Sequence, residues 1–161
     1  MKKILIFLCC LLAPALMAQT TGYVSRAVPS DVYEALLVVN EQHPNSNMTS
    51  TQAKEILKGT IVLEAGFSAC GACENMIKAI EEAGLLSLWQ RQGTRFYQLQ
   101  SIKDGTKNTP RLIDWMTGVA ETTSVPLLFV IKDGKVVAAR KGYNPKDKDS
   151  FISKLKSVTL Q

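Results

Sequence analysis

The run FSACGACE, Phe67–Glu74, places two cysteines three positions apart, directly after the apolar stretch Thr60–Gly66. That stretch contains one acid, Glu64, and is typical of a buried strand. The residues of 70–83 follow a helical pattern of apolar positions. A strand that leads into a helix at a Cys-x-x-Cys pair predicts a site of thiol chemistry, because one helical turn can hold both sulfurs within bonding distance.

The first eighteen residues have the pattern of a secretory signal peptide. Lys2 and Lys3 precede an apolar run over 4–12, and small residues follow up to Ala18. The run is interrupted at Pro14, well short of the ~20 apolar residues of a membrane-spanning helix. We therefore expect cleavage near Ala18 and export to the periplasm, with a retained N-terminal anchor as the alternative.

Composition narrows the class of the mature protein. Two of the 19 basic residues and none of the acids lie in 1–18, so the net charge falls from +5 to +3. A charge this small and this dispersed does not indicate a nucleic-acid-binding surface. A hydrophobic content of 46% excludes a disordered chain. No apolar run after residue 18 is long enough to span a membrane, so we expect no membrane span after cleavage.

The two cysteines that remain after cleavage are Cys70 and Cys73. A disulfide between them would close only a very short loop, so a purely structural role is the weaker interpretation. At a helix N-terminus, free N–H groups and the helix dipole favour an anion, which lowers the pKa of a thiol at position 70 below ~8.5. We expect an exposed Cys70 to act as nucleophile and a more buried Cys73 to resolve the mixed disulfide.

The remaining pattern predicts an α/β fold, a mixed sheet flanked by helices, with a short helical extension before it. We divide the chain into a signal peptide (1–18), the extension (19–58) and the main domain (59–161). The turn Asp133-Gly134 predicts a hairpin. We expect helices near 31–42, 50–58, 70–83, 85–90, 110–116 and 145–158, and strands near 60–66, 95–99, 127–131 and 136–139.

Residues 60–158 resemble the thioredoxin superfamily. The resemblance rests on the strand with Glu64, the Cys70–Cys73 pair that opens a helix, and Val125-Pro126 before a strand and an Asp-Gly hairpin. It implies an enzyme, a protein thiol–disulfide oxidoreductase without organic cofactor or metal. It also implies a cis Val125-Pro126 bond that faces the sulfurs and pairs with the substrate backbone.

Glu64 has two interpretations. If it is buried, its pKa is raised and it can pass protons to and from Cys73, which the resemblance favours. If it lies at the strand end, it faces solvent. The chain departs from the family at Ala69, where a tryptophan is usual, and in having no proline between the cysteines.

The resemblance further implies partners: protein substrates with disulfides or thiols, and a membrane redox partner. Gly71 and Ala72 supply neither a cation nor a ring to stabilise a thiolate, which favours a reductase or isomerase over an oxidase. Two other functions stay open. One is a redox-inert binding or assembly module that docks through 19–58, and the other is a copper chaperone in which Met48 or Met76 assists the cysteines.

Overall fold

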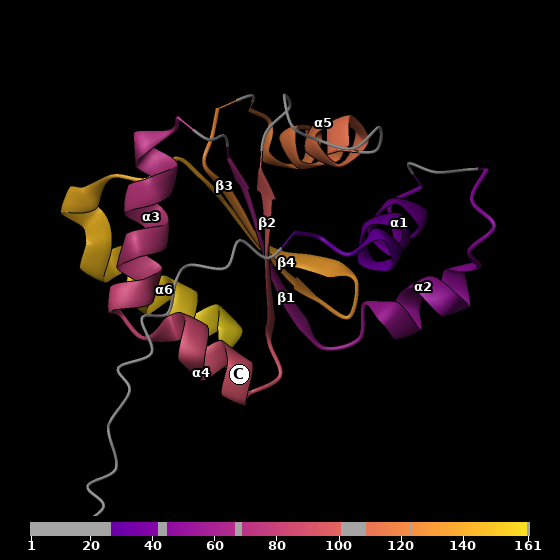
Figure 1. Ribbon diagram of the computed structural model, residues 1–161, viewed down its shortest axis with the longest axis horizontal. Helices are drawn as coiled ribbons and strands as arrows, with labels where there is room; N and C mark the ends of the chain where they lie inside the picture. The colour runs from indigo at the N-terminus through magenta and orange to yellow at the C-terminus, as the bar shows by residue number, and fades with distance from the viewer. Residues whose placement is uncertain (1–26, 42–44, 67–68, 101–108, 123, 161) are drawn as a thin grey trace, which may run out of the picture.

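The computed structural model describes residues 27–41, 45–66, 69–100, 109–122 and 124–160. The predicted signal peptide, its cleavage site and the loop expected at 104–108 lie outside these residues. Within the described residues, a sheet of four strands runs through the middle of the molecule in the order β2-β1-β3-β4 (Figure 1). Its strands are β1 (Thr60–Gly66), β2 (Arg95–Gln100), β3 (Leu127–Lys132) and β4 (Lys135–Lys141).

The pairing of the strands is mixed. β1 pairs with β2 in parallel and with β3 in antiparallel register, and β4 adds an antiparallel edge. The β3–β4 hairpin turns at Asp133 and Gly134, whose φ angles are 49° and 80°. Two positive φ angles in a two-residue loop match the twist of the flanking strands, which explains the Asp-Gly sequence. The predicted mixed sheet and its hairpin are confirmed.

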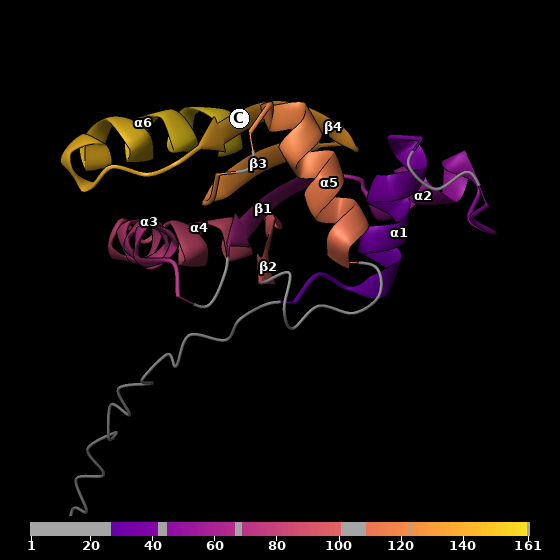
Figure 2. The same cartoon turned by 90° about the horizontal axis from the view of Figure 1, so that it is seen from above.

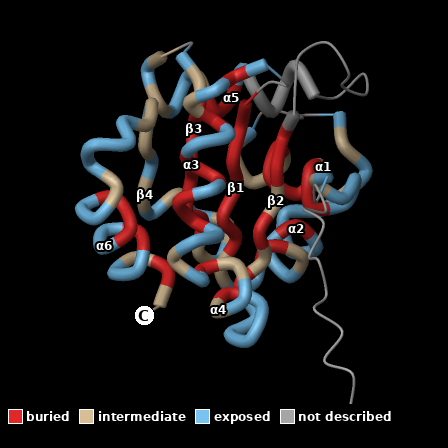
Figure 3. Tube along the Cα trace, turned by 60° about the vertical axis from the view of Figure 1, so that its left-hand side comes forward, coloured by how far each residue is buried: buried red, intermediate tan, exposed pale blue. Residues whose placement is uncertain are grey.

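Helices cover both faces of the sheet (Figures 1 and 2). Apolar residues of α1, α2 and α5 pack on one face, and those of α3, α4 and α6 pack on the other. The buried residues therefore follow the central strands and the inner sides of the helices (Figure 3). The helices are α1 (Ser30–Val39), α2 (Ser50–Ile56), α3 (Gly71–Glu82), α4 (Leu85–Arg91), α5 (Thr109–Ala120) and α6 (Lys148–Thr159), with a 3-10 turn, η1 (Pro145–Asp147), before α6.

Side-chain alternation in β1 assigns residues to the two faces. Ile61, Leu63 and Ala65 belong to the apolar cluster beneath α1, α2 and α5. Val62 belongs to the cluster beneath α3, α4 and α6. Because successive side chains of a strand point to opposite faces, Glu64 shares the α3 face with Val62.

The extension that precedes β1 is part of the core rather than a separate body. Its helices α1 and α2 bury Leu36, Leu37 and Ala53 in the same cluster as strand residues. Thr49 starts α2 with a capping box: its side chain accepts a hydrogen bond from the backbone of Gln52, whose side chain accepts one from the backbone of Thr49. The apolar faces of both helices are thus used within the chain, which weakens the interpretation of 19–58 as a docking segment.

Three predicted boundaries are wrong. Helix α5 continues through Gly118 to Ala120, because Ala120 packs against the apolar cluster on that face and offsets the ~1 kcal/mol cost of one exposed helical glycine. Helix α2 ends at Ile56 rather than Lys58. Helix α1 ends at Val39 rather than near residue 42.

No helix within the described residues is long and apolar enough to cross a membrane.

Candidate functional site

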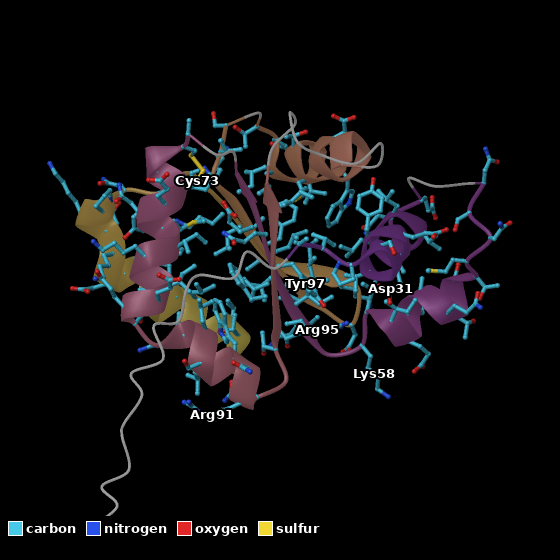
Figure 4. All side chains as sticks on the ribbon, viewed as in Figure 1. Asp31, Lys58, Cys73, Arg91, Arg95 and Tyr97 are labelled. Carbon is cyan, nitrogen blue, oxygen red and sulfur yellow. A yellow bond between two sulfur atoms is a disulfide. The ribbon has the colours of Figure 1, made fainter. Side chains whose placement is uncertain are left out.

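The cysteine pair lies where β1 leads into α3. Cys70 is the N-cap residue of α3, and Cys73 lies in the first turn. Their sulfurs form a disulfide with an S–S distance of 2.09 Å, at the end of α3 marked by the label of Cys73 in Figure 4. The backbone N–H of Cys73 donates a hydrogen bond to Sγ of Cys70 at 3.2 Å. The helix start therefore directs a donor at Cys70, as expected for a site that stabilises a thiolate.

The two cysteines are equally buried. Cys70 is 7% exposed and Cys73 is 6% exposed, so the expectation of an exposed Cys70 is wrong for the disulfide form. The physical reason is the bond itself, which holds Sγ of Cys70 over the first turn of α3 beside Sγ of Cys73.

Glu64 lies in the centre of the sheet and is 1% exposed. Burial raises its pKa from 4.5 to about 7, and a hydrogen bond from the side chain of Gln98 opposes part of that rise. Nε2 of Gln98 donates to Oε2 of Glu64 at 3.3 Å, from the paired position on β2. The solvent-facing interpretation of Glu64 is therefore wrong. A carboxyl with a pKa near neutrality can both take up and release a proton.

Gly66 brings Glu64 and Cys73 together. A Cβ atom on residue 66 would lie 2.6 Å from Oε1 of Glu64 and 2.8 Å from Sγ of Cys73. Both atoms therefore border one small space, and Oε1 of Glu64 has no hydrogen-bond partner within the described residues. The free carboxylate oxygen is the one on the side of the sulfur.

The predicted residues Val125 and Pro126 precede β3. The peptide bond between them is cis, and the carbonyl of Pro126 accepts a hydrogen bond from the N–H of Gly142 at 2.8 Å. Leu127, the first residue of β3, pairs with Ala65, so the Val125-Pro126 turn lies at the end of the sheet where β1 ends at Gly66. The turn and the disulfide consequently lie at the same end of the sheet.

Sequence reasoning missed two residues of this site, Gln98 and Gly66. Gln98 could be identified only from the register of β2 against β1, because that register pairs Gln98 with Glu64. Gly66 is visible in the sequence as the last residue of the strand, but the reason for a small residue there becomes clear only from the position of Cys73.

Potential metal ligands are scattered. Within the described residues, no group of three histidine, cysteine, aspartate or glutamate side chains is arranged to hold a metal ion. Met76 lies on the α3 face of the sheet, whereas Met48 packs against the cluster on the opposite face. Met48 therefore cannot share a copper ion with the cysteine pair.

The strand order, the cysteine pair at the start of a helix and the turn before β3 give the chain a thioredoxin-like fold. No protein-family model matches the sequence, and no curated protein matches it.

Solved structures similar to the chain include proteins from three organisms. A Chlorobium tepidum protein described as a thiol:disulfide interchange protein DsbE is 15% identical, with a TM-score of 0.47, over 63% of this chain and 80% of that one. Chlamydomonas reinhardtii thioredoxin f2 is 17% identical, with a TM-score of 0.43, over 65% and 82%. Fasciola hepatica thioredoxin is 20% identical, with a TM-score of 0.42, over 65% and 92%.

Proposed function

We propose that the protein is an exported thiol–disulfide oxidoreductase that reduces or isomerises disulfides of protein substrates. The observation that carries the proposal is the Cys70–Cys73 disulfide at the start of α3, with a buried carboxyl beside the second sulfur. A reversible disulfide needs a stabilised thiolate, a second thiol within reach and a means to move one proton. The surroundings of the pair offer all three.

In the first step the reduced pair acts on a substrate disulfide. The thiolate of Cys70 attacks one substrate sulfur, an S–S bond forms between them, and the other substrate sulfur leaves as a thiolate that takes a proton from water. The N–H of Cys73 that donates to Sγ of Cys70 stabilises the attacking thiolate.

In the second step the substrate is released. The carboxylate of Glu64 removes the proton from Cys73, whose sulfur then attacks Sγ of Cys70 and expels the substrate as a thiolate. Two electrons have passed from the cysteine pair to the substrate, and the Cys70–Cys73 disulfide has formed. We assign the peptide groups of Val125 to the substrate backbone, because Pro126 has no N–H and the turn lies at the same end of the sheet as the disulfide.

Each turnover that reduces a substrate disulfide leaves the pair oxidised, and isomerisation also needs the pair in its reduced form, so the protein needs a partner that supplies two electrons. We propose a membrane redox partner that faces the periplasm, since 1–18 has the pattern of a signal peptide cleaved near Ala18. N-terminal sequencing of the protein recovered from a periplasmic fraction tests the location. A first residue near Gln19 is expected, and an intact N-terminus in the membrane fraction contradicts it.

Trapping of a mixed disulfide tests the function. A Cys73→Ala variant, incubated with a peptide disulfide, is expected to gain the mass of one peptide half through Cys70, because no second thiol can release it. The Cys70→Ala variant is expected to gain none, and the double variant serves as the blank. If adducts form only in the Cys70→Ala variant, through Cys73, the assignment of the two cysteines is reversed. An absence of adducts in both single variants favours the binding or assembly module instead.

The reduction potential of the pair tests the direction of electron flow. A reductase is expected to lie near about −270 mV and an isomerase near about −180 mV, whereas an oxidant lies near about −120 mV, the values of three members of this superfamily. Equilibration of the wild-type protein with glutathione buffers, followed by mass spectrometry of the alkylated thiols, measures it. A value near the oxidising end would overturn the assignment as a reductant.

A further inference from the structure

Gln98 is a buried polar residue of β2 that exchanges no bond or proton in the two steps of the proposed reaction. Its side chain is 4% exposed, and it is paired with Glu64 across the neighbouring strands β1 and β2 (Figure 1). Nε2 of Gln98 donates to Oε2 of Glu64 at 3.3 Å, whereas Oε1 of Gln98 has no hydrogen-bond partner within the described residues. The amide is therefore oriented by its contact with the carboxyl.

Stability alone does not explain this buried pair. A polar oxygen removed from water without a donor costs free energy, and within the described residues Oε1 of Glu64 and Oε1 of Gln98 are both in that condition. Phe96, two positions earlier on β2, packs in the apolar cluster beneath α3, α4 and α6. An apolar residue at position 98 would extend that row and avoid one of these costs. The amide at this position therefore indicates a role at the carboxyl rather than in packing.

The two oxygens of the Glu64 carboxyl have different surroundings. Oε2 accepts the hydrogen bond from Gln98. Oε1 borders the space beside Gly66 that Sγ of Cys73 also borders. An N–H that holds Oε2 fixes the rotation of the carboxyl group, which leaves Oε1 on the side of the sulfur. The amide thus determines which oxygen receives the proton of Cys73.

Gln98 is also a neutral donor beside a carboxyl that has no cation next to it. On β3 the residue paired with Glu64 is the apolar Leu128, and Arg140 of β4 lies one strand further out. From α3, Cys73 borders the carboxyl and titrates only when the pair is reduced. Burial raises the pKa of Glu64 to about 7, and the hydrogen bond from Gln98 opposes that rise. A neutral donor stabilises the ionised form less than a cation does, so the carboxyl can still gain and lose a proton near neutral pH.

We propose that Gln98 is a positioning residue for substrate release, which directs Oε1 of Glu64 at Cys73 and favours the ionised carboxyl. The inference rests on the proposed function, since it concerns the second step of the exchange. In that step the proton of the Cys73 thiol passes to Oε1 of Glu64, and the sulfur of Cys73 bonds to Sγ of Cys70. The bond between Cys70 and the substrate breaks, and the substrate leaves as a thiolate. Gln98 itself neither gains nor loses a proton.

The decay of the mixed disulfide as a function of pH tests the proposal. Reduced protein is mixed with an excess of a peptide disulfide and quenched with acid at set times, and mass spectrometry quantifies the mixed disulfide. Because release needs the ionised carboxyl, its rate in the wild-type protein is expected to rise with pH up to the pKa of Glu64 and then to level off. Gln98→Leu removes the donor, so the midpoint is expected to shift upward by about one pH unit, and release at pH 6 is expected to slow about tenfold.

Three further variants distinguish an effect through Glu64 from damage to the fold. Gln98→Lys supplies a charged donor, so it is expected to shift the midpoint below that of the wild type. Gln90→Leu, at an exposed glutamine of α4, is the matched control and is expected to keep the wild-type profile. In a Glu64→Gln background, Gln98→Leu is expected to change the release rate no further, because Gln98 acts through the carboxyl.

A measurement on the wild-type protein keeps the inference testable if Gln98→Leu does not fold. In the oxidised protein, the side-chain N–H resonances of Gln98 are expected to shift with the same pH midpoint as the carboxyl of Glu64, and those of Gln90 are expected to stay constant. If the wild-type protein forms no mixed disulfide, the proposed function fails and this inference fails with it. If it forms and resolves one, an unshifted midpoint in folded Gln98→Leu, or Gln98 resonances that do not follow Glu64, would overturn this inference alone.

Discussion

Glu64 and Cys73 face the same small space, the one that a side chain on residue 66 would occupy. One carboxylate oxygen and the second sulfur border that space from β1 and α3, at 2.6 Å and 2.8 Å from the position of a Cβ atom on Gly66. Both residues are buried, and the carboxyl has a pKa near neutrality. Absence of a side chain at 66 is therefore what allows a proton acceptor to approach the resolving sulfur.

The first prediction concerns Gly66→Ala. The carboxylate of Glu64 can rotate away from a methyl group, but Cys73 cannot, because its sulfur is bonded to Cys70 and its Cβ also lies within 3.2 Å. Overpacking of this kind is expected to destabilise the oxidised protein by about 1–3 kcal/mol. Urea denaturation measures the loss. Gly118→Ala is the matched control, since nothing lies near a Cβ there and a helical Gly→Ala change stabilises by about 0.5–1 kcal/mol. Equal stability of the two variants contradicts the close approach.

The second prediction concerns pH and Glu64. Its pKa is 4.5 when exposed and about 7 in the folded protein. A carboxyl with a raised pKa stabilises the fold fully below pH 4.5, loses this contribution as the pH rises towards 7, and changes no further above that. The loss amounts to about 3 kcal/mol. Between pH 4.5 and pH 8, the unfolding free energy of the oxidised wild-type protein is expected to fall by about 3 kcal/mol more than that of Glu64→Gln. The other titrating groups are common to the two proteins, so they do not contribute to this difference. Parallel pH profiles of the two proteins would refute the buried carboxyl.

Much of the redox site could be predicted because its signals are local in sequence. Two cysteines three positions apart, after an apolar strand and before a helical pattern, determine where the disulfide lies. The Asp133-Gly134 turn likewise gives the hairpin from two residues. Glu64 was ambiguous, since a strand covered on both faces shows no polar alternation.

The residues that could not be predicted depend on contacts between distant segments. Gln98 reaches Glu64 only because β2 pairs with β1 in one particular register. The end of α5 could not be predicted from Gly118, because the contact of Ala120 with the apolar cluster lies beyond the glycine and depends on distant segments. Arg140 of β4 lies over the ring of Phe151 of α6, and no sequence pattern relates these two elements.

The third prediction concerns Gln98→Leu. This change removes the hydrogen bond that holds the pKa of Glu64 down and leaves the burial that raises it. The pKa of Glu64 is therefore expected to rise above its wild-type value of about 7. A ¹³C NMR titration of the carboxyl in the oxidised protein measures it. Gln90→Leu, an exposed glutamine of α4, is the control. A lower or unchanged pKa in Gln98→Leu would show that the amide does not stabilise the carboxylate.

The fourth prediction concerns the thiol of Cys70 in the reduced protein. Stabilisation comes from the start of α3 and the N–H of Cys73, because Gly71 and Ala72 add no charge. The pKa of the thiol is therefore expected between ~5 and ~8.5. Ala72→His places a cation beside the thiolate, so it is expected to lower that pKa further and to make the disulfide more oxidising. The rate of alkylation by iodoacetamide as a function of pH measures the pKa of Cys70 in the wild-type protein and in Ala72→His. A wild-type pKa below ~5, or no change in Ala72→His, would mean that groups other than the helix start control the reactivity of Cys70.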